Sequence, residues 1–173
     1  MSKKALIIVD MLNDFVDKNG VLYCGDTVLP IIPFIKERLR AFRDQGDVVI
    51  YLQDSHDSDD KEFERFPRHS IAGTWGSEVI PELVPLPGEA VIPKKRFSGF
   101  FGTGLENLLA SAGVAQVEVV GVCTSICVMD TVGGLANRDY KATVPVQGVA
   151  DFNPEFHQFS LNRMREIYGA DVS

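Results

Sequence analysis

The amino-acid sequence predicts an α/β protein, in which an open, parallel β-sheet forms a single domain with helices on both faces. Two observations lead to this class. Short apolar, β-branched runs alternate with longer segments of helical periodicity, and most connections between them are tight. Length is a third observation, because 173 residues suffice for one well-buried domain and are too few for two ordinary ones. We therefore expect one domain over residues 1–173.

The predicted strands are short runs in which apolar, often β-branched residues follow one another between turn-forming residues. Five such runs occur, at residues 5–9, 47–52, 90–92, 117–121 and 142–146. Val172 is predicted to belong to a last short strand. Two irregular regions, residues 20–30 and 55–87, interrupt the alternation, and the second is too long for a simple connector. We expect this second region to carry part of a functional site.

The first two predicted helices have clear end signals. Residues 31–42 place apolar side chains at helical intervals, and Gly46 follows as a predicted terminator. A second helix is expected to open at Thr103, because Thr103 and Glu106 have the spacing of a capping box.

Two further helices are predicted in the C-terminal third. One runs from about Ser125 to about Asn137, although its Gly-Gly pair weakens the middle. The other begins at Asn153-Pro154, which has the form of an N-cap followed by Pro at the first helical position, and closes at Gly169.

Composition and charge exclude several classes of partner. The formal net charge of -7 and a pI near 4.9 repel phosphate backbones and anionic lipid, and no Lys/Arg cluster opposes that field. The first apolar run is far shorter than a signal-peptide core, and no stretch reaches transmembrane length. We expect a cytoplasmic protein without nucleic-acid or membrane partners. Its three cysteines, an odd number, are expected to be thiols.

Reactive side chains follow four of the five predicted strands. Asp10 ends the first run, Asp54 and His56 follow the second, Lys94 follows the third, and residues 123–127 follow the fourth. Parallel α/β sheets bind ligands outside the carboxyl ends of their strands, so these groups are expected to converge. Taken singly, Asp10 also fits a strand-end cap and Lys94 a solvated loop lysine.

Cys127 lies in a turn where an apolar strand runs into a predicted helix. A helix N-terminus favours the thiolate and offers free backbone N–H groups, so a cysteine there can be both acidified and flanked by oxyanion donors. A buried structural thiol would show the same spacing. Cys123 and Cys127 lack the spacing of a redox or zinc pair.

Asp54, His56 and His69 offer one carboxylate and two imidazoles, a suitable donor set for divalent Zn, Mn or Fe. A hydrogen-bonded surface loop is the alternative. Glu62 is a candidate fourth ligand, in competition with four other acidic residues nearby, Asp57, Asp59, Asp60 and Glu64. His157, which lies between two phenylalanines of a predicted helix, is expected to be structural.

As a set, these segments resemble the isochorismatase-like cysteine hydrolases, and within them the nicotinamidases (pyrazinamidases) of Gram-positive bacteria. The resemblance covers nearly the whole chain. The matching segments are residues 5–10 with Asn13-Asp14-Phe15, Asp54-Ser55-His56, Phe66-Pro67-Arg68-His69 with Gly73-Thr74, residues 94–100 with Gly102-Thr103, residues 121–128, and residues 154–159. Each segment alone is unspecific, but the combination is specific.

The resemblance implies a Rossmann-like three-layer fold and assigns a role to each catalytic residue. The family's nucleophile falls on Cys127, its carboxylate on Asp10 and its lysine on Lys94. Members have an oxyanion hole, here the N–H groups of Cys123 and Cys127, with a cis peptide bond just before Cys123.

The resemblance also implies one divalent metal ion, with zinc first and manganese or iron as alternatives. The metal-binding aspartate and histidines of the family fall on Asp54, His56 and His69, and the extra glutamate of some members falls on Glu62. Related carbamoyl-amide hydrolases often lack the full set, so the two histidines favour the nicotinamidase branch.

The implied reaction is hydrolysis of nicotinamide to nicotinate and ammonia through a cysteine thioester, in NAD salvage. Phe15 and Phe66 are candidates for the wall that contacts the substrate ring, or else ordinary core residues. Family analogy suggests a homo-oligomer. The alternatives are an amidase of the same fold for another small carboxamide or carbamoyl amide, and a ligand-binding member without activity. Isochorismatases proper lack the cysteine nucleophile, so Cys127 argues against that reaction. Residues 130–137 depart from the family's usual run, so the resemblance does not imply how this helix packs.

Overall fold

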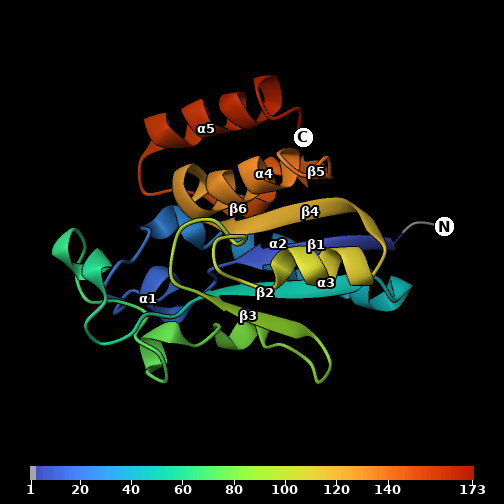
Figure 1. Ribbon diagram of the computed structural model, residues 1–173. Coiled ribbons are helices and arrows are strands. Elements are labelled where there is room, and N and C mark those ends of the chain that lie inside the picture. Colours follow the sequence, from blue (N-terminus) through green and yellow to red (C-terminus); the bar gives the residue numbers. More distant parts are fainter. Residues whose placement is uncertain (1–2) are drawn as a thin grey trace.

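The computed structural model describes residues 3–173 and has a parallel sheet of seven strands between layers of helices (Figure 1). The strands are β1 (Lys3–Val9), β2 (Val48–Asp54), β3 (Ala90–Lys94), β4 (Val114–Val122), β5 (Lys141–Val144), β6 (Val149–Ala150) and β7 (Asp171–Val172). The predicted fold class, the five predicted strands and the strand at Val172 are confirmed, whereas β6 was not predicted. β5 ends two residues earlier than expected because Pro145 has no N–H for the ladder.

The strand order reverses at the centre of the sheet. The order is β3-β2-β1-β4-β5-β7, with β6 paired to β4, so the chain builds outward from β1 to one edge and then from β4 to the other. The crevice at such a reversal is where open α/β sheets bind ligands. β1 and β4 approach closely there, because a Cβ on Gly121 would lie 2.1 Å from the backbone oxygen of Val9. Only glycine fits at that position, where φ is +117°.

Helices cover both faces of the sheet. The long helix α2 (Ile31–Gln45) lies on one face, and α3 (Leu105–Ser111) and α4 (Met129–Ala136) lie on the other, with α5 (Pro154–Glu166) packed outside α4 (Figure 1). The central strand β1 is buried on both sides: Leu6 and Ile8 face α2, and Ile7 and Val9 face the opposite layer. Among the helices of residues 3–173, none has the length and apolarity needed to cross a membrane.

The helix ends match the sequence signals in two cases. Gly46 caps α2 in the left-handed conformation, as predicted, with φ of 68°. The Asn153 side chain accepts hydrogen bonds from the N–H groups of Glu155 and Phe156, which confirms the predicted N-cap of α5. This helix ends at Glu166, three residues before the predicted Gly169.

Two helix predictions are wrong in detail. The capping box at Thr103 does not form, because α3 begins at Leu105 and the carboxylate of Glu106 pairs with Arg138 at 2.8 Å instead. The helix expected from about residue 125 begins with a π-type turn, Thr124–Val128, in which the Val128 N–H donates to the oxygen of Cys123. Regular α-helix starts only at Met129.

A buried carboxylate ties the two irregular regions together. Asp14, in the short helix α1 (Asn13–Val16), accepts hydrogen bonds from the N–H of Val21 at 3.2 Å and from the N–H of Ser70 at 2.7 Å. Gly76 leaves the space that this carboxylate occupies, since a Cβ there would lie 2.1 Å from Asp14 Oδ2. The loops after β1 and β2 are therefore held against each other.

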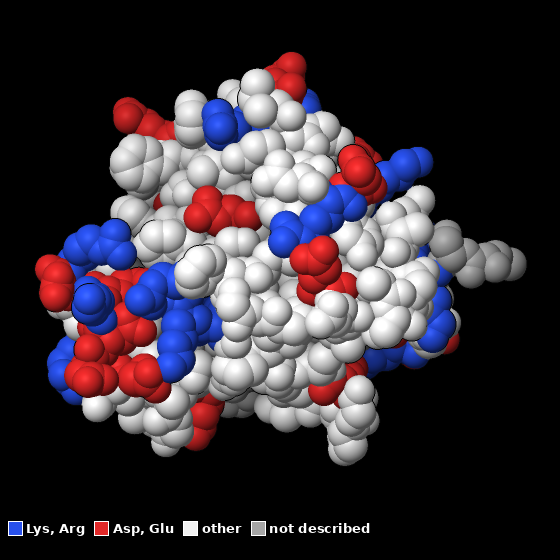
Figure 2. Space-filling model, in the orientation of Figure 1, with Lys and Arg blue, Asp and Glu red and all other residues white. Residues whose placement is uncertain are grey.

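Charged side chains of both signs are spread over the surface. On the face drawn in Figure 2, basic groups are interspersed with acidic ones rather than gathered into one basic area. This distribution agrees with the net charge of -7.

Candidate active site

Three predicted residues from separate strand ends meet at the carboxyl edge of the sheet. Asp10 follows β1, Lys94 ends β3 and Cys127 lies in the π-type turn after β4. Lys94 Nζ is 2.8 Å from Asp10 Oδ2 and 3.4 Å from Cys127 Sγ. It also donates to Asp54 Oδ1 at 3.1 Å, and all four side chains are buried. The lysine thus connects an acid, a thiol and a second carboxylate.

The carboxylate of Asp10 is held from both sides. Its Oδ1 accepts a hydrogen bond from the Asp54 N–H at 2.9 Å, while Oδ2 faces Lys94. The backbone of Asp10 has φ of 48°, a left-handed conformation that is uncommon for residues other than glycine and is found mainly at functional sites. These constraints fix the direction in which the carboxylate points.

Burial and pairing set the protonation states of this group. Burial raises the pKa of the Asp10 carboxyl, although the Lys94 ammonium opposes the shift. Burial also raises the pKa of Cys127 well above its ordinary value, with Lys94 again opposing, so the resting group is a thiol. Burial would lower the pKa of Lys94, but Asp10, Cys127 and Asp54 raise it, so the amine stays charged. The expectation that the turn acidifies Cys127 is therefore wrong, because desolvation outweighs it.

The turn that carries the cysteine is anchored by polar contacts. Asp151 accepts a hydrogen bond from the Ser125 N–H at 2.7 Å, and His157 Nδ1 lies 2.9 Å from Thr124 Oγ1. The Val122–Cys123 peptide bond is cis, as the resemblance implied. No pattern in the sequence pointed to Asp151, whereas the structural role expected for His157 agrees with its contact with Thr124.

The predicted metal ligands form a cluster beside Lys94. Asp54, His56 and His69 each offer one ligand atom, and these atoms lie within 4.8 Å of one another. Asp54 Oδ2 is 3.0 Å from His56 Nε2 and 3.3 Å from His69 Nε2. The other ring nitrogens are engaged elsewhere, His56 Nδ1 with Asp60 at 3.1 Å and His69 Nδ1 with the Pro67 oxygen at 2.7 Å. Such outer contacts orient imidazoles as metal ligands.

Glu62 has the features of a fourth ligand. Its Oε1 lies 3.9 Å from His56 Nε2 and 4.0 Å from His69 Nε2. Its Oε2 is buried and has no hydrogen-bond partner among residues 3–173, and the Arg96 guanidinium approaches it only to 3.9 Å, so a closer cation would stabilise the carboxylate. Burial raises the pKa of Glu62. Two imidazoles and two carboxylates therefore fit a divalent ion such as zinc.

The rival acidic residue Asp60 has a different position. Its carboxylate accepts a hydrogen bond from the Glu62 N–H at 2.9 Å and pairs with Arg96 at 3.1 Å, while it holds His56. Burial would lower the pKa of His56, but the hydrogen bonds to Asp54 and Asp60 raise it to about 9. From the sequence alone, Asp60 is only one of four acidic residues that compete with Glu62.

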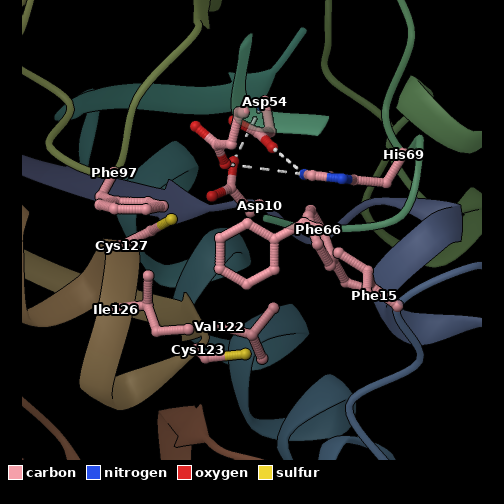
Figure 3. Close-up of a pocket in the computed structure, with 12 residues that line it drawn as sticks. Asp10, Phe15, Asp54, Phe66, His69, Phe97, Val122, Cys123, Ile126 and Cys127 are labelled. Atoms are coloured by element: carbon pink, nitrogen blue, oxygen red, sulfur yellow. Dashed lines mark hydrogen bonds and ion pairs between the residues drawn. The ribbon is translucent and has the colours of Figure 1, made fainter. Parts of the chain in front are cut away.

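Asp10, Cys127 and three of the candidate metal ligands, Asp54, Glu62 and His69, line one pocket (Figure 3), whereas His56 lies behind its wall. Its empty space, including the open mouth, is about 400 Å³, and most of its wall is apolar. The predicted Phe15 and Phe66 both line it, with ring centroids 5.8 and 6.2 Å from that of His69. Four further apolar lining residues were not predicted: Leu22, Phe97, Val122 and Ile126. Of these, Val122 and Ile126 directly precede Cys123 and Cys127, and Phe97 lies in the matching segment 94–100, whereas Leu22 had no signal in the sequence. The pocket suits a small, flat ligand.

Known proteins resemble the chain over its full length. A protein of Bacillus subtilis described as isochorismatase family protein PncA is 37% identical over 181 residues, covering 99% of this chain and 99% of the relative. A crystal structure of nicotinamidase/pyrazinamidase PncA from Bacillus subtilis superposes with a TM-score of 0.94 at 37% identity, covering 99% of both chains.

Two other relatives show how far the likeness extends. A ureidoacrylate amidohydrolase of Cronobacter turicensis is 30% identical over 193 residues, covering 96% of this chain and 83% of the relative. The pyrazinamidase of Pyrococcus horikoshii, solved in complex with zinc, has a TM-score of 0.91 at 29% identity, covering 99% of this chain and 98% of that one. The family model described as Isochorismatase domain matches residues 4–173. With this match and the shared fold, the chain belongs to the isochorismatase family of hydrolases.

Proposed function

We propose that this hydrolase is a nicotinamidase, which converts nicotinamide to nicotinate and ammonia through a thioester on Cys127. The observation that carries the proposal is the contact of Lys94 with both Asp10 and Cys127, at 2.8 and 3.4 Å, beside a small pocket that Asp10, Cys127, Asp54 and His69 line. His56 completes the candidate metal cluster behind Asp54 and His69. The likeness to the Bacillus subtilis nicotinamidase supports the choice of substrate.

In the proposed first half-reaction, Asp10 takes the proton of Cys127 as the sulfur attacks the carboxamide carbon. The raised pKa of the Asp10 carboxyl makes it a competent base, and the fixed charge of Lys94 stabilises the developing thiolate. The backbone N–H groups of Cys123 and Cys127 are assigned to the tetrahedral oxyanion. Asp10 then delivers its proton to the nitrogen, and ammonia leaves.

The second half-reaction releases the acid. Asp10 takes a proton from a water molecule, and the resulting hydroxide attacks the thioester carbon. Nicotinic acid departs as Asp10 returns the proton to the sulfur of Cys127, and it then loses its own proton to solvent to give nicotinate. The enzyme thus returns to its starting state. Phe15 and Phe66, which approach His69 edge-on, are assigned to contact with the pyridine ring.

We assign one divalent ion to Asp54, His56, His69 and Glu62. Zinc is the first choice because two imidazoles and two carboxylates suit it and because the Pyrococcus horikoshii relative was solved with zinc, with manganese or iron as alternatives. When bound, the ion supplies a Lewis acid that orients the substrate ring. The chain's own contacts with Asp60 and the Pro67 oxygen already orient both imidazoles.

Other parts of the proposal concern the cell. The product nicotinate would enter NAD salvage in the cytoplasm. We further propose that the protein acts on small molecules, without nucleic-acid or membrane partners, and self-associates as a homo-oligomer.

A carbamoyl amide is the second candidate substrate, because the ureidoacrylate amidohydrolase is 30% identical. The apolar wall of the pocket favours a flat aromatic ring over a polar ureido chain. Ammonia release from nicotinamide, compared with release from a panel of carbamoyl amides, separates the two substrates. A protein that binds nicotinamide without releasing ammonia would be the non-catalytic alternative.

Substitution of the thiol tests the covalent route. Cys127→Ala is expected to lower ammonia release from nicotinamide by at least about 10³-fold while metal content stays unchanged. Cys24→Ala is the matched control, because Cys24 is also buried but lies outside the pocket, and it is expected to retain activity. Turnover by Cys127→Ala within tenfold of the native rate would contradict the thioester.

A further inference from the structure

Two cysteines from distant parts of the chain touch behind the pocket. Cys24 lies between α1 and the short helix Asp26–Val28, and Cys123 directly follows β4. Their sulfur atoms are 3.1 Å apart although the residues are 99 positions apart. A disulfide bond is about 2.05 Å long, so the sulfurs need to approach by only about 1 Å to bond. Among the three cysteines of the described chain, this is the one sulfur–sulfur contact.

The two thiols differ in access. Cys24 is 2% exposed, and its N–H donates to the Phe15 oxygen at 2.9 Å. Cys123 is half-buried and lines the pocket, where Figure 3 shows it on the side away from Asp54 and His69. Of these two cysteines, a small solute in the pocket therefore reaches Cys123 and not Cys24. The hydrogen bond with Cys24 and burial raise the pKa of Cys123, so the resting pair consists of thiols.

The geometry points to a modification site, in which Cys24 and Cys123 form a reversible disulfide when hydrogen peroxide enters the pocket. Cys123 reacts through its minor thiolate form: the thiol loses its proton, the sulfur attacks one peroxide oxygen, and the O–O bond breaks. The departing hydroxide takes up the proton as one water, which leaves a sulfenic acid on Cys123. The sulfur of Cys24 attacks the Cys123 sulfur, the S–S bond forms, and the hydroxyl leaves as a second water. Two thiols lose two electrons and two protons, and the peroxide is reduced to two waters. A dithiol reductant reverses the bond.

The disulfide has a consequence for catalysis that rests on the proposed function. The N–H of Cys123 is assigned to the oxyanion, and bonding to Cys24 draws Cys123 away from the pocket. A displacement of about 1 Å in a catalytic group costs up to about 100-fold in rate. The oxidised enzyme is therefore expected to be at least about tenfold slower.

The bond itself is tested without any activity. In Cys127→Ser only Cys24 and Cys123 remain, so an intramolecular disulfide formed with hydrogen peroxide joins these two. Mass spectrometry of the intact chain should show the loss of two hydrogens, and unreduced peptides should show the cross-link, both reversed by dithiothreitol. The double variant Cys24→Ser/Cys127→Ser is the control and should show neither. Sulfinic or sulfonic acid on Cys123 without a cross-link would overturn the proposal.

The native chain tests the consequence. After peroxide, activity should fall with the cross-linked fraction and return with dithiothreitol, while Cys24→Ser keeps its activity under the same treatment. Alkylation after denaturation measures the fraction of Cys127 that remains a thiol, which separates oxidation of Cys127 from formation of the disulfide. Equal losses of activity in the native chain and in Cys24→Ser would overturn the proposed effect of the disulfide on the oxyanion site. If the cross-link forms in a chain that has no nicotinamidase activity before treatment, only the proposed function is overturned. Circular dichroism checks the fold, with Cys24→Ala as the substitute if Cys24→Ser does not fold.

Discussion

Lys94 is the residue on which the charge balance of the site depends. Its ammonium is fully buried and lies 2.8 Å from Asp10 and 3.1 Å from Asp54. A buried charge is tolerated only when partners of opposite charge and hydrogen bonds replace water, and the same holds for the two carboxylates. Lys94 therefore stabilises both sides of the pocket, the thiol side through Asp10 and the metal side through Asp54.

Lys94→Met should lower the free energy of unfolding by about 3–5 kcal/mol at pH 7, because it leaves the buried carboxylate of Asp10 without a cation and Asp54 with only the imidazolium of His56 and the imidazole of His69. The loss should shrink towards pH 4. Without the ammonium, the effect of burial on Asp10 loses its main opposition, and the folded-state pKa of this carboxyl rises further above its unfolded value. The folded variant therefore takes up this proton at a higher pH than the unfolded chain and gains relative stability as the pH falls. Urea unfolding at both pH values measures this.

The neighbouring residue provides a matched control for this prediction. Lys95 is exposed and pairs with Asp57 at the surface, so Lys95→Met should change stability by less than about 1 kcal/mol. Equal effects of the two substitutions would show that the buried pairings of Lys94 contribute nothing.

At the residue scale, the sequence predicted which groups meet. Asp10, Lys94 and Cys127 were located because polar residues directly after apolar runs lie at the carboxyl edge of a parallel sheet. The contacts of Asp14 and Asp60 could not be predicted, because they depend on how two long loops fold and on which of several acidic side chains turns inward. The catalytic and metal-binding roles themselves stay predictions until the substitutions are made.

At the scale of elements, the glycine pair in α4 has a packing cause. A Cβ on Gly134 would lie 2.5 Å from Cδ2 of Phe100, and one on Gly133 would lie 3.1 Å from the Tyr168 ring. The Phe100 ring is in turn covered by the Arg138 guanidinium at 4.3 Å. The two glycines lower the intrinsic stability of the helix, but they allow two aromatic rings to approach its backbone.

Gly134→Ala should therefore destabilise the protein by about 1 kcal/mol or more, although alanine favours a helix by about the same amount. The double variant Gly134→Ala/Phe100→Ala should lose less than the sum of the single changes, because removing the ring removes the clash. Thermal or urea unfolding of the native protein, the two single variants and the double variant measures this coupling as a double-mutant cycle. A gain of stability in Gly134→Ala would contradict the packing.

An ion pair fastens the segment before the edge strand β3 to α2. Arg43 donates two hydrogen bonds to Glu89, at 2.7 and 2.8 Å, and both side chains are largely buried. Burial alone would raise the pKa of Glu89, but the hydrogen bonds from Arg43 lower it below its ordinary value. A depressed folded-state pKa contributes stability above the unfolded pKa of about 4.3, and this is lost as the pH falls through the folded value.

Glu89→Gln should thus cost about 1–3 kcal/mol at pH 7, and the difference from the native protein should shrink below about pH 4. Urea midpoints measured from pH 3 to pH 7 test this. Glu37→Gln in α2 is the control, because Glu37 is exposed and has no hydrogen bond or ion pair among residues 3–173. A difference that does not depend on pH would exclude the charged pair as the cause.

Element type was more predictable than element detail. The apolar runs and the caps at Gly46 and Asn153 are local signals, and the structure contains them. The capping box at Thr103 failed because a distant Arg138 binds Glu106, and the π-type turn before α4 is set by tertiary contacts that periodicity does not record.

At the scale of the whole molecule, a bound metal should stabilise the fold. After chelation and dialysis, added zinc should raise Tm by several degrees, because the cluster of Asp54, His56 and His69, with Glu62 beside it, forms only in the folded chain. The affinity should rise from pH 6 to pH 8, since His56, with a pKa of about 9, must lose a proton to bind. Calorimetry in two buffers should detect the released protons.

A substitution outside the cluster is the control for metal binding. His56→Asn should abolish the zinc-induced rise in Tm, while His157→Asn, which changes an imidazole bound to Thr124, should keep it. Unchanged metal stabilisation in His56→Asn would contradict the ligand assignment.

The two clusters of buried apolar side chains, one on each face of the sheet, should unfold together. Both lie against the same strands, one on each face of β1, so neither can lose its packing alone. We predict one cooperative transition, with calorimetric and van't Hoff enthalpies equal, for the metal-loaded protein. Two separable transitions would contradict the prediction of a single domain over residues 1–173.

The bridge made by Asp14 limits how this protein can be re-engineered. One carboxylate accepts hydrogen bonds from the N–H groups of Val21 and Ser70, and the second of these follows His69 directly. Grafting the loop of a relative at either position would disturb the other through this shared acceptor. Transplanting substrate preference would therefore require both loops to be exchanged as one cassette, together with the aspartate that joins them.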